Sequence, residues 1–487
     1  MLTITRRRAL TLRSVLRRAF GSRGPGPALC FTAAAGTLSV RATAGDIAVE
    51  YRTSTDAAEQ TLWLPIQLLA DCEGRKDEPV LLEASGKAHV TGQWRDGNVP
   101  QIVKYDSPNP PADANKFPMP PETFAANPPG LLKALVDASD TTDPDSTRFA
   151  LGCVQLHPGG VIGATDGRQL LVQSGFTFPW EETLLIPRSK VFGSPELPRD
   201  QPVHVGKVGD WVALQMGEWT VWLAVNKDGR FPDVERHIPR PANAVARCQF
   251  SAADADLLVR TLPKLPGDDE YNSPITVDLN GQIAVRAKGA DQARPAEAVL
   301  TGSERSGEPI RFNTNRQYLL RALKLGLREM FFVSDKVAVV CHDESRRYAW
   351  MPLESETAIA PADDAKRIES SQAAADTSSP DPKPKRRIPT VSESPTNANG
   401  NATTNIAAST NGHAANRNGQ ARKTTGGKPD LHDTAALIEQ AEKLRTTAHD
   451  LMYEASGLVK ALKQHRRQSR AIQSTLASLR QLKDLGV

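Results

Sequence analysis

Basic side chains are the residues of this sequence whose type and spacing could do chemistry. They crowd two segments with helical spacing, near residues 6–18 and 316–328, and recur between them. Such groups neutralise phosphates without reading base edges, which gives salt-sensitive, sequence-independent binding. Any one of them could be an ordinary solvated residue, so the argument rests on the set. We predict a phosphate-binding surface from Arg6, Arg7, Arg13, Arg17, Arg23, Lys133, Arg188, Lys190, Arg260, Lys264, Arg316, Arg321 and Lys324.

Sequence patterns typical of an active site are missing. There is no HExxH, GxSxG or GxGxxG motif, and the P-loop-like Gly426-Gly427-Lys428 is followed by Pro429. Nine histidines show no metal-ligand spacing. The acidic clusters at 181–182 and 268–270 fall in expected loops, where solvated turns are the ordinary interpretation. We therefore expect no catalytic residue, no metal and no cofactor.

The charge of the 487-residue chain is distributed unevenly. Residues 1–356 carry 41 Lys and Arg against 43 Asp and Glu, so polyanion binding there requires local patches. Five separate cysteines without a CxxC motif argue against a disulfide framework and fit a reducing cytosol. Since no apolar run approaches 18 residues, we expect no membrane-spanning helix.

Three elements recur in the same order at intervals of about 122 residues, the signature of an internal repeat. The first is an amphipathic helical segment at 6–20, 128–139 and 252–262. The second is a glycine-led strand pattern starting at Gly36, Gly160 and Gly281. The third is a strand running into a short helix, starting at Leu62, Leu184 and Ile310. The first 23 residues alone would suit a mitochondrial presequence, but the repeat requires 6–20 as its first helix.

Each repeat is expected to close with a β-hairpin. The predicted hairpins are 94–105 around Asp96-Gly97, 219–232 around Asp228-Gly229, and 337–353 around 342–345. We therefore predict an α+β fold of three repeated β-rich domains, each with two helices. Their predicted bounds are 1–118, 119–240 and 241–356.

The composition changes after residue 356. Ala, Ser, Thr, Asn, Pro and Gly dominate 357–429, which predicts a disordered linker. From 430 to 487 leucine and alanine follow a heptad pattern that predicts a coiled coil, with a lone helical hairpin as the alternative. The linker could tether this helix to the domains.

Four stretches of residues 1–356 carry distinctive motifs: RFALGCVQL at 148–156, ATDGRQLL at 164–171, DGRFPDVERHIP at 228–239, and IRFNTNRQYLLRALKLG from 310 with RYAWMPLE at 347–354. Together they resemble the bacterial β sliding clamp, the processivity subunit of DNA polymerase III. The first domain resembles the family mainly through the repeat pattern.

The resemblance implies a non-catalytic accessory subunit that encircles double-stranded DNA as a head-to-tail homodimeric ring. Helices would line the hole and β-sheets would form the wall. It also implies a cytoplasmic, nucleoid-associated protein that binds the polymerase and clamp-loader subunits. A diverged paralogue that acts as a scaffold through its coiled coil is the competing interpretation. A nuclease is disfavoured because metal ligands are missing from the sequence.

The family also has a pocket for short linear motifs between its second and third domains. Gln169 stands where the family usually has a second basic residue. Without the resemblance, the leucines concerned would be taken as core residues of two strands. Carried over position by position, the pocket would consist of Leu151, Thr165, Gly167, Arg168, Leu170, Pro239, Met351, Pro352 and Leu353.

Overall fold

The computed structural model describes residues 1–21, 26–86, 88–108, 117–143, 150–233, 236, 238–267 and 272–370. All of these belong to one unit, Met1–Lys385. The predicted coiled coil, the linker beyond residue 370 and Arg23 lie outside the described residues.

The first two repeats are built mainly from antiparallel strands. The first contains β1 (Leu2–Thr5), α1 (Arg6–Phe20), β2 (Ala28–Ala34), β3 (Thr37–Ala44), β4 (Ile47–Ser54), β5 (Gln60–Pro65), α2 (Gln67–Cys72), β6 (Pro79–Ala84), β7 (His89–Asp96) and β8 (Val99–Asp106). The second contains β9 (Ala125–Asn127), α3 (Gly130–Ser139), β10 (Cys153–His157), β11 (Val161–Thr165), β12 (Gln169–Gln173), β13 (Leu184–Pro187), the 3-10 turn η2 (Val191–Gly193), β14 (Val203–Val208), β15 (Trp211–Met216) and β16 (Trp219–Ala224).

The third repeat follows a 3-10 turn, η4 (Pro241–Asn243), and has the same order of elements with the turn η5 and the strand β21 added. It contains β17 (Ala246–Gln249), α4 (Ala252–Thr261), η5 (Leu262–Lys264), β18 (Pro274–Asp278), β19 (Ile283–Ala287), β20 (Ala296–Leu300), β21 (Glu304–Gly307), β22 (Arg311–Asn315), α5 (Arg316–Lys324), β23 (Glu329–Phe332), β24 (Val339–His342) and β25 (Arg346–Trp350). After it come η6 (Ser355–Thr357) and β26 (Lys366–Glu369).

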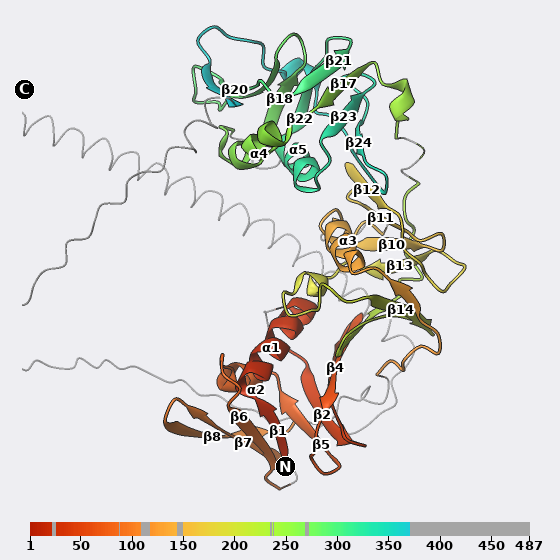
Figure 1. Cartoon of the computed structure of the whole chain (residues 1–487), viewed down its shortest axis with the longest axis vertical. Helices are drawn as coiled ribbons and strands as arrows, with labels where there is room; N and C mark the ends of the chain where they lie inside the picture. The colour runs from red at the N-terminus through yellow and green to blue at the C-terminus, as the bar shows by residue number, and fades with distance from the viewer. Residues whose placement is uncertain are drawn as a thin grey trace, which may run out of the picture. The chain divides into compact units, whose positions relative to one another are not determined.

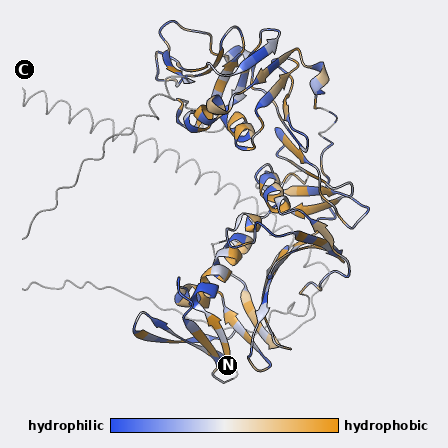
Figure 2. Ribbon diagram, in the orientation of Figure 1, coloured by the Kyte–Doolittle hydropathy of each residue, from blue (hydrophilic) through white to orange (hydrophobic). Residues whose placement is uncertain are grey.

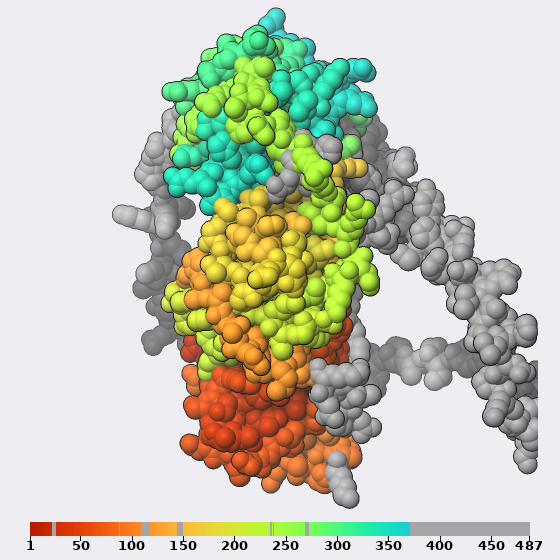
Figure 3. Space-filling model, turned by 90° about the vertical axis from the view of Figure 1, so that its right-hand side faces the viewer, coloured from red at the N-terminus to blue at the C-terminus, as the bar shows by residue number. Residues whose placement is uncertain are grey.

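Two sheets continue from one repeat into the next. The order β5-β2-β3-β4-β16-β15-β14-β9 joins the first repeat to the second, and β13-β10-β11-β12-β25-β24-β23-β17-β21 joins the second to the third. At each joint the two strands are antiparallel, with Val49 opposite Val221 and Leu171 opposite Tyr348. The end sheets are β1-β6-β7-β8 and β22-β18-β19-β20-β26. Figure 3 shows side chains of successive repeats in contact along one face.

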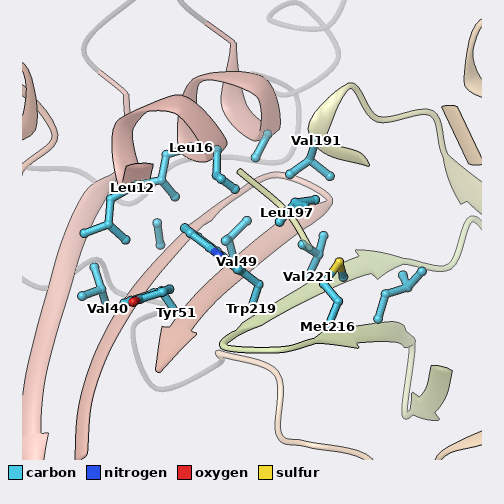
Figure 4. Packing of buried hydrophobic residues seen from close by; sticks show 14 of the residues in the cluster. Leu12, Leu16, Val40, Val49, Tyr51, Val191, Leu197, Met216, Trp219 and Val221 are labelled. Atoms are coloured by element: carbon cyan, nitrogen blue, oxygen red, sulfur yellow. The ribbon is translucent and has the colours of Figure 1, made fainter. Parts of the chain in front are cut away.

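Helix α1 illustrates how the sequence places a helix on these sheets. The Thr5 side chain accepts a hydrogen bond from the Arg8 amide (3.1 Å), which caps the N-terminus, and Gly21 ends the helix at a φ of +84°. Leu12 and Leu16, one helical turn apart, are buried against the sheets. Figure 4 shows them facing Val49 and Trp219, which come from the two strands of the first joint.

Hydrophobic residues are concentrated in the strands and on one side of the helices (Figure 2). In Figure 1, α1, α3, α4 and α5 lie on the same side of the sheets. The polar sides of these helices therefore point away from the strands.

Three sequence-based expectations are corrected. The second helix of the middle repeat is only the 3-10 turn η2, because the turn ends at Gly193 and Pro195 follows two residues later. Asp228-Gly229 is a loop, since β16 pairs with the preceding β15, whereas the hairpins β7–β8 and β24–β25 are confirmed. The expectation of disorder is wrong for 357–370, which includes the strand β26.

Candidate nucleic-acid interface and peptide groove

The predicted basic residues fall into two groups in the structure. Six are exposed or half-buried and form no ion pair with another described residue: Arg17, Arg188, Lys190, Arg260, Lys264 and Lys324. They lie on α1, between β13 and η2, on α4, on η5 and on α5, so all three repeats contribute. Arg7 and Lys133 are exposed as well but pair with Asp77 (3.6 Å) and Asp137 (2.5 Å).

The other described basic residues are used within the fold. Arg6 pairs with Glu78 (3.1 Å) and Asp96 (3.0 Å); burial acts to lower its pKa, but these partners raise it above the ordinary value. Arg316 is buried and donates to the carbonyl oxygens of Ser273 and Pro266, and burial lowers its pKa. These contacts remove Arg6 and Arg316 from the set available to a phosphate.

Arg13 and Arg321 are also engaged. Arg13 pairs with Glu73, and Arg321 donates to the Asp137 carbonyl and to the Thr141 hydroxyl (2.8 Å). Because Arg321 lies on α5 and its acceptors lie at the end of α3, it ties the helices of adjacent repeats together. The spacing of basic residues in the sequence does not distinguish those that pair within the fold from those that face solvent.

A groove of about 190 Å³ lies at the joint between the second and third repeats. Its walls are mainly apolar, with Arg168 and Thr165 at the polar part. A mostly apolar groove with few polar atoms suits an extended peptide. The lining consists of Thr165, Gly167, Arg168, Gln169, Leu170, Ile238, Ala338, Ala349, Trp350 and Met351.

The turn between β11 and β12 shapes one wall of this groove. Gly167 has a φ of +87°, a conformation that favours glycine. One Asp166 oxygen accepts from the amides of Arg168 and Gln169, each at 2.8 Å. The Met351 amide donates to the Arg168 carbonyl (2.9 Å), which extends the β12–β25 ladder along the groove.

Gln169 has a structural role where the family usually has a basic residue. Its side-chain nitrogen donates to Asp166 (2.8 Å) and its oxygen accepts from the Tyr348 hydroxyl (2.6 Å). Tyr348 is fully buried, and burial raises the pKa of its phenol well above the ordinary value. This chain of hydrogen bonds fixes the β12–β25 joint beneath the groove.

The equivalent place at the first joint is filled. Leu170 faces Ala349 at the second joint, whereas Ala48 faces Trp222 at the first. Phe117 packs edge-on against Trp222 with ring centroids 5.1 Å apart. The cavity of about 70 Å³ beside Phe117 is lined from β2, β3 and β5, and neither Ala48 nor Trp222 is part of its lining. The small Ala349 in place of a tryptophan thus opens the groove at the second joint.

Five of the predicted pocket residues line the groove: Thr165, Gly167, Arg168, Leu170 and Met351. Leu151 lies next to Gly167 but is not part of the lining, and neither are Pro239, Pro352 and Leu353. The predicted set lacks five lining residues: Gln169, Ile238, Ala338, Ala349 and Trp350. Ala349 and Trp350 directly precede the predicted Met351, and their pairing with β12 would have identified them.

The described residues contain neither a cluster of metal-binding side chains nor a helix that could span a membrane. No cluster of three or more His, Cys, Asp or Glu there could hold a metal ion. No helix within the same ranges is long and apolar enough to cross a membrane.

Known proteins match this chain by their fold but not by their sequence. No family model and no curated protein sequence matches the chain. The structure is similar to the DNA polymerase III subunit beta from Pseudomonas aeruginosa, with a TM-score of 0.59 and 19% identity over 72% of this chain and 99% of that chain.

Two further solved structures cover the same shares of the two chains. The DnaN sliding clamp from Pseudomonas aeruginosa bound to griselimycin has a TM-score of 0.60 at 19% identity. A putative DNA polymerase III beta subunit from Eubacterium rectale has a TM-score of 0.59 at 12% identity. The chain therefore contains the fold of the bacterial DNA polymerase III β sliding clamps.

Proposed function

We propose that this protein is a DNA sliding clamp: two copies close head to tail into a ring around duplex DNA and hold a polymerase or another partner beside it. The protein would be a non-catalytic subunit working in the cytoplasm. Processivity would come from topology, because a closed ring can slide without tight contacts.

The observation that carries the proposal is a joint between repeats that occurs twice in the chain and has a third pair of equivalent strands left over. In the repeat, β4, β12 and β20 are equivalent, and so are β8, β16 and β25. The chain pairs β4 with β16 and β12 with β25, which leaves β8 at the edge of its sheet and leaves β20 paired with β26 instead of with a strand of the β8 type. A third joint between β20 of one copy and β8 of another is a head-to-tail contact that closes after two copies.

The exposed side chains of β8 suit such a joint. Val99 and Ile102 are 58% and 70% exposed, although both are apolar residues in a strand. A free strand edge with apolar side chains is an aggregation risk unless a partner covers it. A second copy would remove that risk.

The unpaired cations support the DNA part of the proposal. They lie on helices and turns of all three repeats, and Figure 1 shows α1, α4 and α5 on the same side of the sheets. They would neutralise phosphates of any sequence. The groove beside Ala349 would hold the linear motif of a polymerase or clamp loader.

The test combines solution mass with DNA topology. Sedimentation of the full chain over a dilution series should show a monomer–dimer equilibrium, which Ile102→Lys should abolish. Met119→Lys is the matched control, since Met119 is equally exposed (71%) and lies outside β8. Dimers assembled on a nicked circular plasmid should survive a high-salt wash and be released by linearisation. Equal loss from circular and linear DNA would contradict encirclement and favour the scaffold interpretation.

A further inference from the structure

The edge of β20 that the third joint would need is occupied in the described chain. β20 pairs with β19 on one side and with β26 on the other. The two joints inside the chain are antiparallel, whereas β26 runs parallel to β20. β26 therefore occupies the edge of β20 that the third joint would use, and it pairs there in a parallel rather than an antiparallel direction.

Residues 354–370, which we call the strap, carry β26 across the end sheet. Asn313 on β22 donates to the Glu354 carbonyl (3.1 Å) and the Thr357 hydroxyl (2.5 Å). The Ile359 amide then donates to the Thr276 hydroxyl on β18 (2.8 Å). Thr276 and Asn313 are fully buried. The strap is thus a folded cover that ends at the β20 edge.

Few contacts hold β26 at this edge. The Lys366 amide donates to the Pro295 carbonyl (2.9 Å), and Arg367 pairs with Glu297 (2.6 Å). The Ser370 hydroxyl lies 2.8 Å from that of Thr301. Four residue pairs join β26 to β20, and the first three residues of β26 are exposed. Each internal joint has five pairs between largely buried strands.

We propose that β26 is a displaceable cap that competes with β8 of a second copy for the outer edge of β20. The inference rests on the proposed function, because it concerns the closure of the same ring. A strand in a sheet has two neighbours, so β26 and the incoming β8 exclude each other. The strap thereby sets how readily the ring closes and reopens.

Competition of this kind has a quantitative signature. A ring of two copies has two such joints, so both caps must leave before it closes. While the cap is mostly docked, the apparent dissociation constant of the dimer therefore exceeds the intrinsic one by the square of the ratio of docked to free cap. A substitution that weakens docking tightens the dimer by the square of that weakening. The net value of one hydrogen bond corresponds to about fivefold at each joint, or about 25-fold in the dimer constant.

Two variants of the full chain weaken the cap, each with a matched control. Residues two apart in a strand face the same neighbour, so the Ile368 amide faces β20 as that of Lys366 does, and the Glu369 amide faces away. Ile368→Pro removes a ladder bond, and Glu369→Pro is its control. Arg367→Glu places a carboxylate against Glu297, and Lys366→Glu is the control with the same charge change.

Sedimentation measures the dimer constant, and hydrogen exchange of the β20 amides reports whether the cap has left. We expect Ile368→Pro and Arg367→Glu to tighten the dimer about 25-fold, with both controls within twofold of the unsubstituted chain. The proposal that β26 is a cap would be overturned if β20 exchanged faster in the monomer while the dimer dissociation constant stayed unchanged. It would also be overturned if slow β20 exchange showed that β26 stays docked in both variants. A chain that forms no dimer in any variant would instead refute the ring, and the cap with it.

Discussion

Replacing Arg286 with methionine should destabilise the third repeat by about 3 kcal/mol. Arg286 is buried between Asp278 and Glu297, pairing with the first and lying 2.6 Å from the second. Removing one partner of a buried ion pair costs about 3–5 kcal/mol, because the remaining charges stay buried. We expect a cost at the lower end of this range, because Asp278 still pairs with Arg311 (3.2 Å) and Glu297 still pairs with Arg367 (2.6 Å).

Native-state hydrogen exchange of the β18 and β19 amides measures this loss in the full chain. Arg311→Met is the matched control: its side chain is 32% exposed, so we expect about 1 kcal/mol. A loss below about 1 kcal/mol for Arg286→Met would refute the argument that the cluster is held by its central arginine.

The pH dependence gives an independent check. Burial acts to raise the pKa of Asp278, but the Arg286 hydrogen bond, with help from the Asn280 amide and Arg311, holds it below the ordinary value. A depressed pKa contributes stability above the unfolded value that is lost as the pH falls. The substitution removes this contribution, so the difference between the variant and the unsubstituted chain should shrink below about pH 4. A difference that grows in acid would contradict the assignment.

Four further substitutions test the two joints and the DNA surface. Ala349→Trp gives the second joint the residue of the first, Trp222, and should reduce the calorimetric affinity for an extended apolar peptide at least about tenfold while the dimer constant stays unchanged; equal binding would place the peptide elsewhere. Phe117→Ala should cost about 2 kcal/mol in unfolding experiments, less than a fully buried phenylalanine because its ring is half-buried. Lys264→Gln should reduce the slope of log duplex affinity against log salt by about 0.9 for each phosphate that the residue no longer neutralises. Lys133→Gln should reduce this slope by less, because Asp137 already neutralises Lys133. Identical slopes for the two variants would show that Lys264 is not part of the interface.

Local elements of the fold could be predicted from the sequence. The helix Arg6–Phe20 and the hairpins β7–β8 and β24–β25 follow from periodicity and turn residues, which act over a few positions. The pairing of β12 with β25 could not be predicted, because it joins residues about 177 apart in register. The same distance in sequence concealed Ala349 as a groove residue.

Composition and charge alone predicted less of the structure than periodicity and turn residues did. The strap has few large apolar residues, so its order was missed; backbone and side-chain hydrogen bonds to the end sheet hold it instead. Arg6 and Arg17 both lie on α1, yet one is tied to acidic residues and the other is exposed. Only the tertiary neighbours decide which cation is free.

The difference between Ala349 and Trp222 has a consequence for valency. Each copy has one open groove at its second joint and a filled one at its first, so a two-copy ring would offer two sites rather than four. A polymerase and one repair factor could then bind the same ring at the same time, and a third partner could bind only after one of them had dissociated. The small side chain of Ala349 would thereby set the number of partners that one ring can hold.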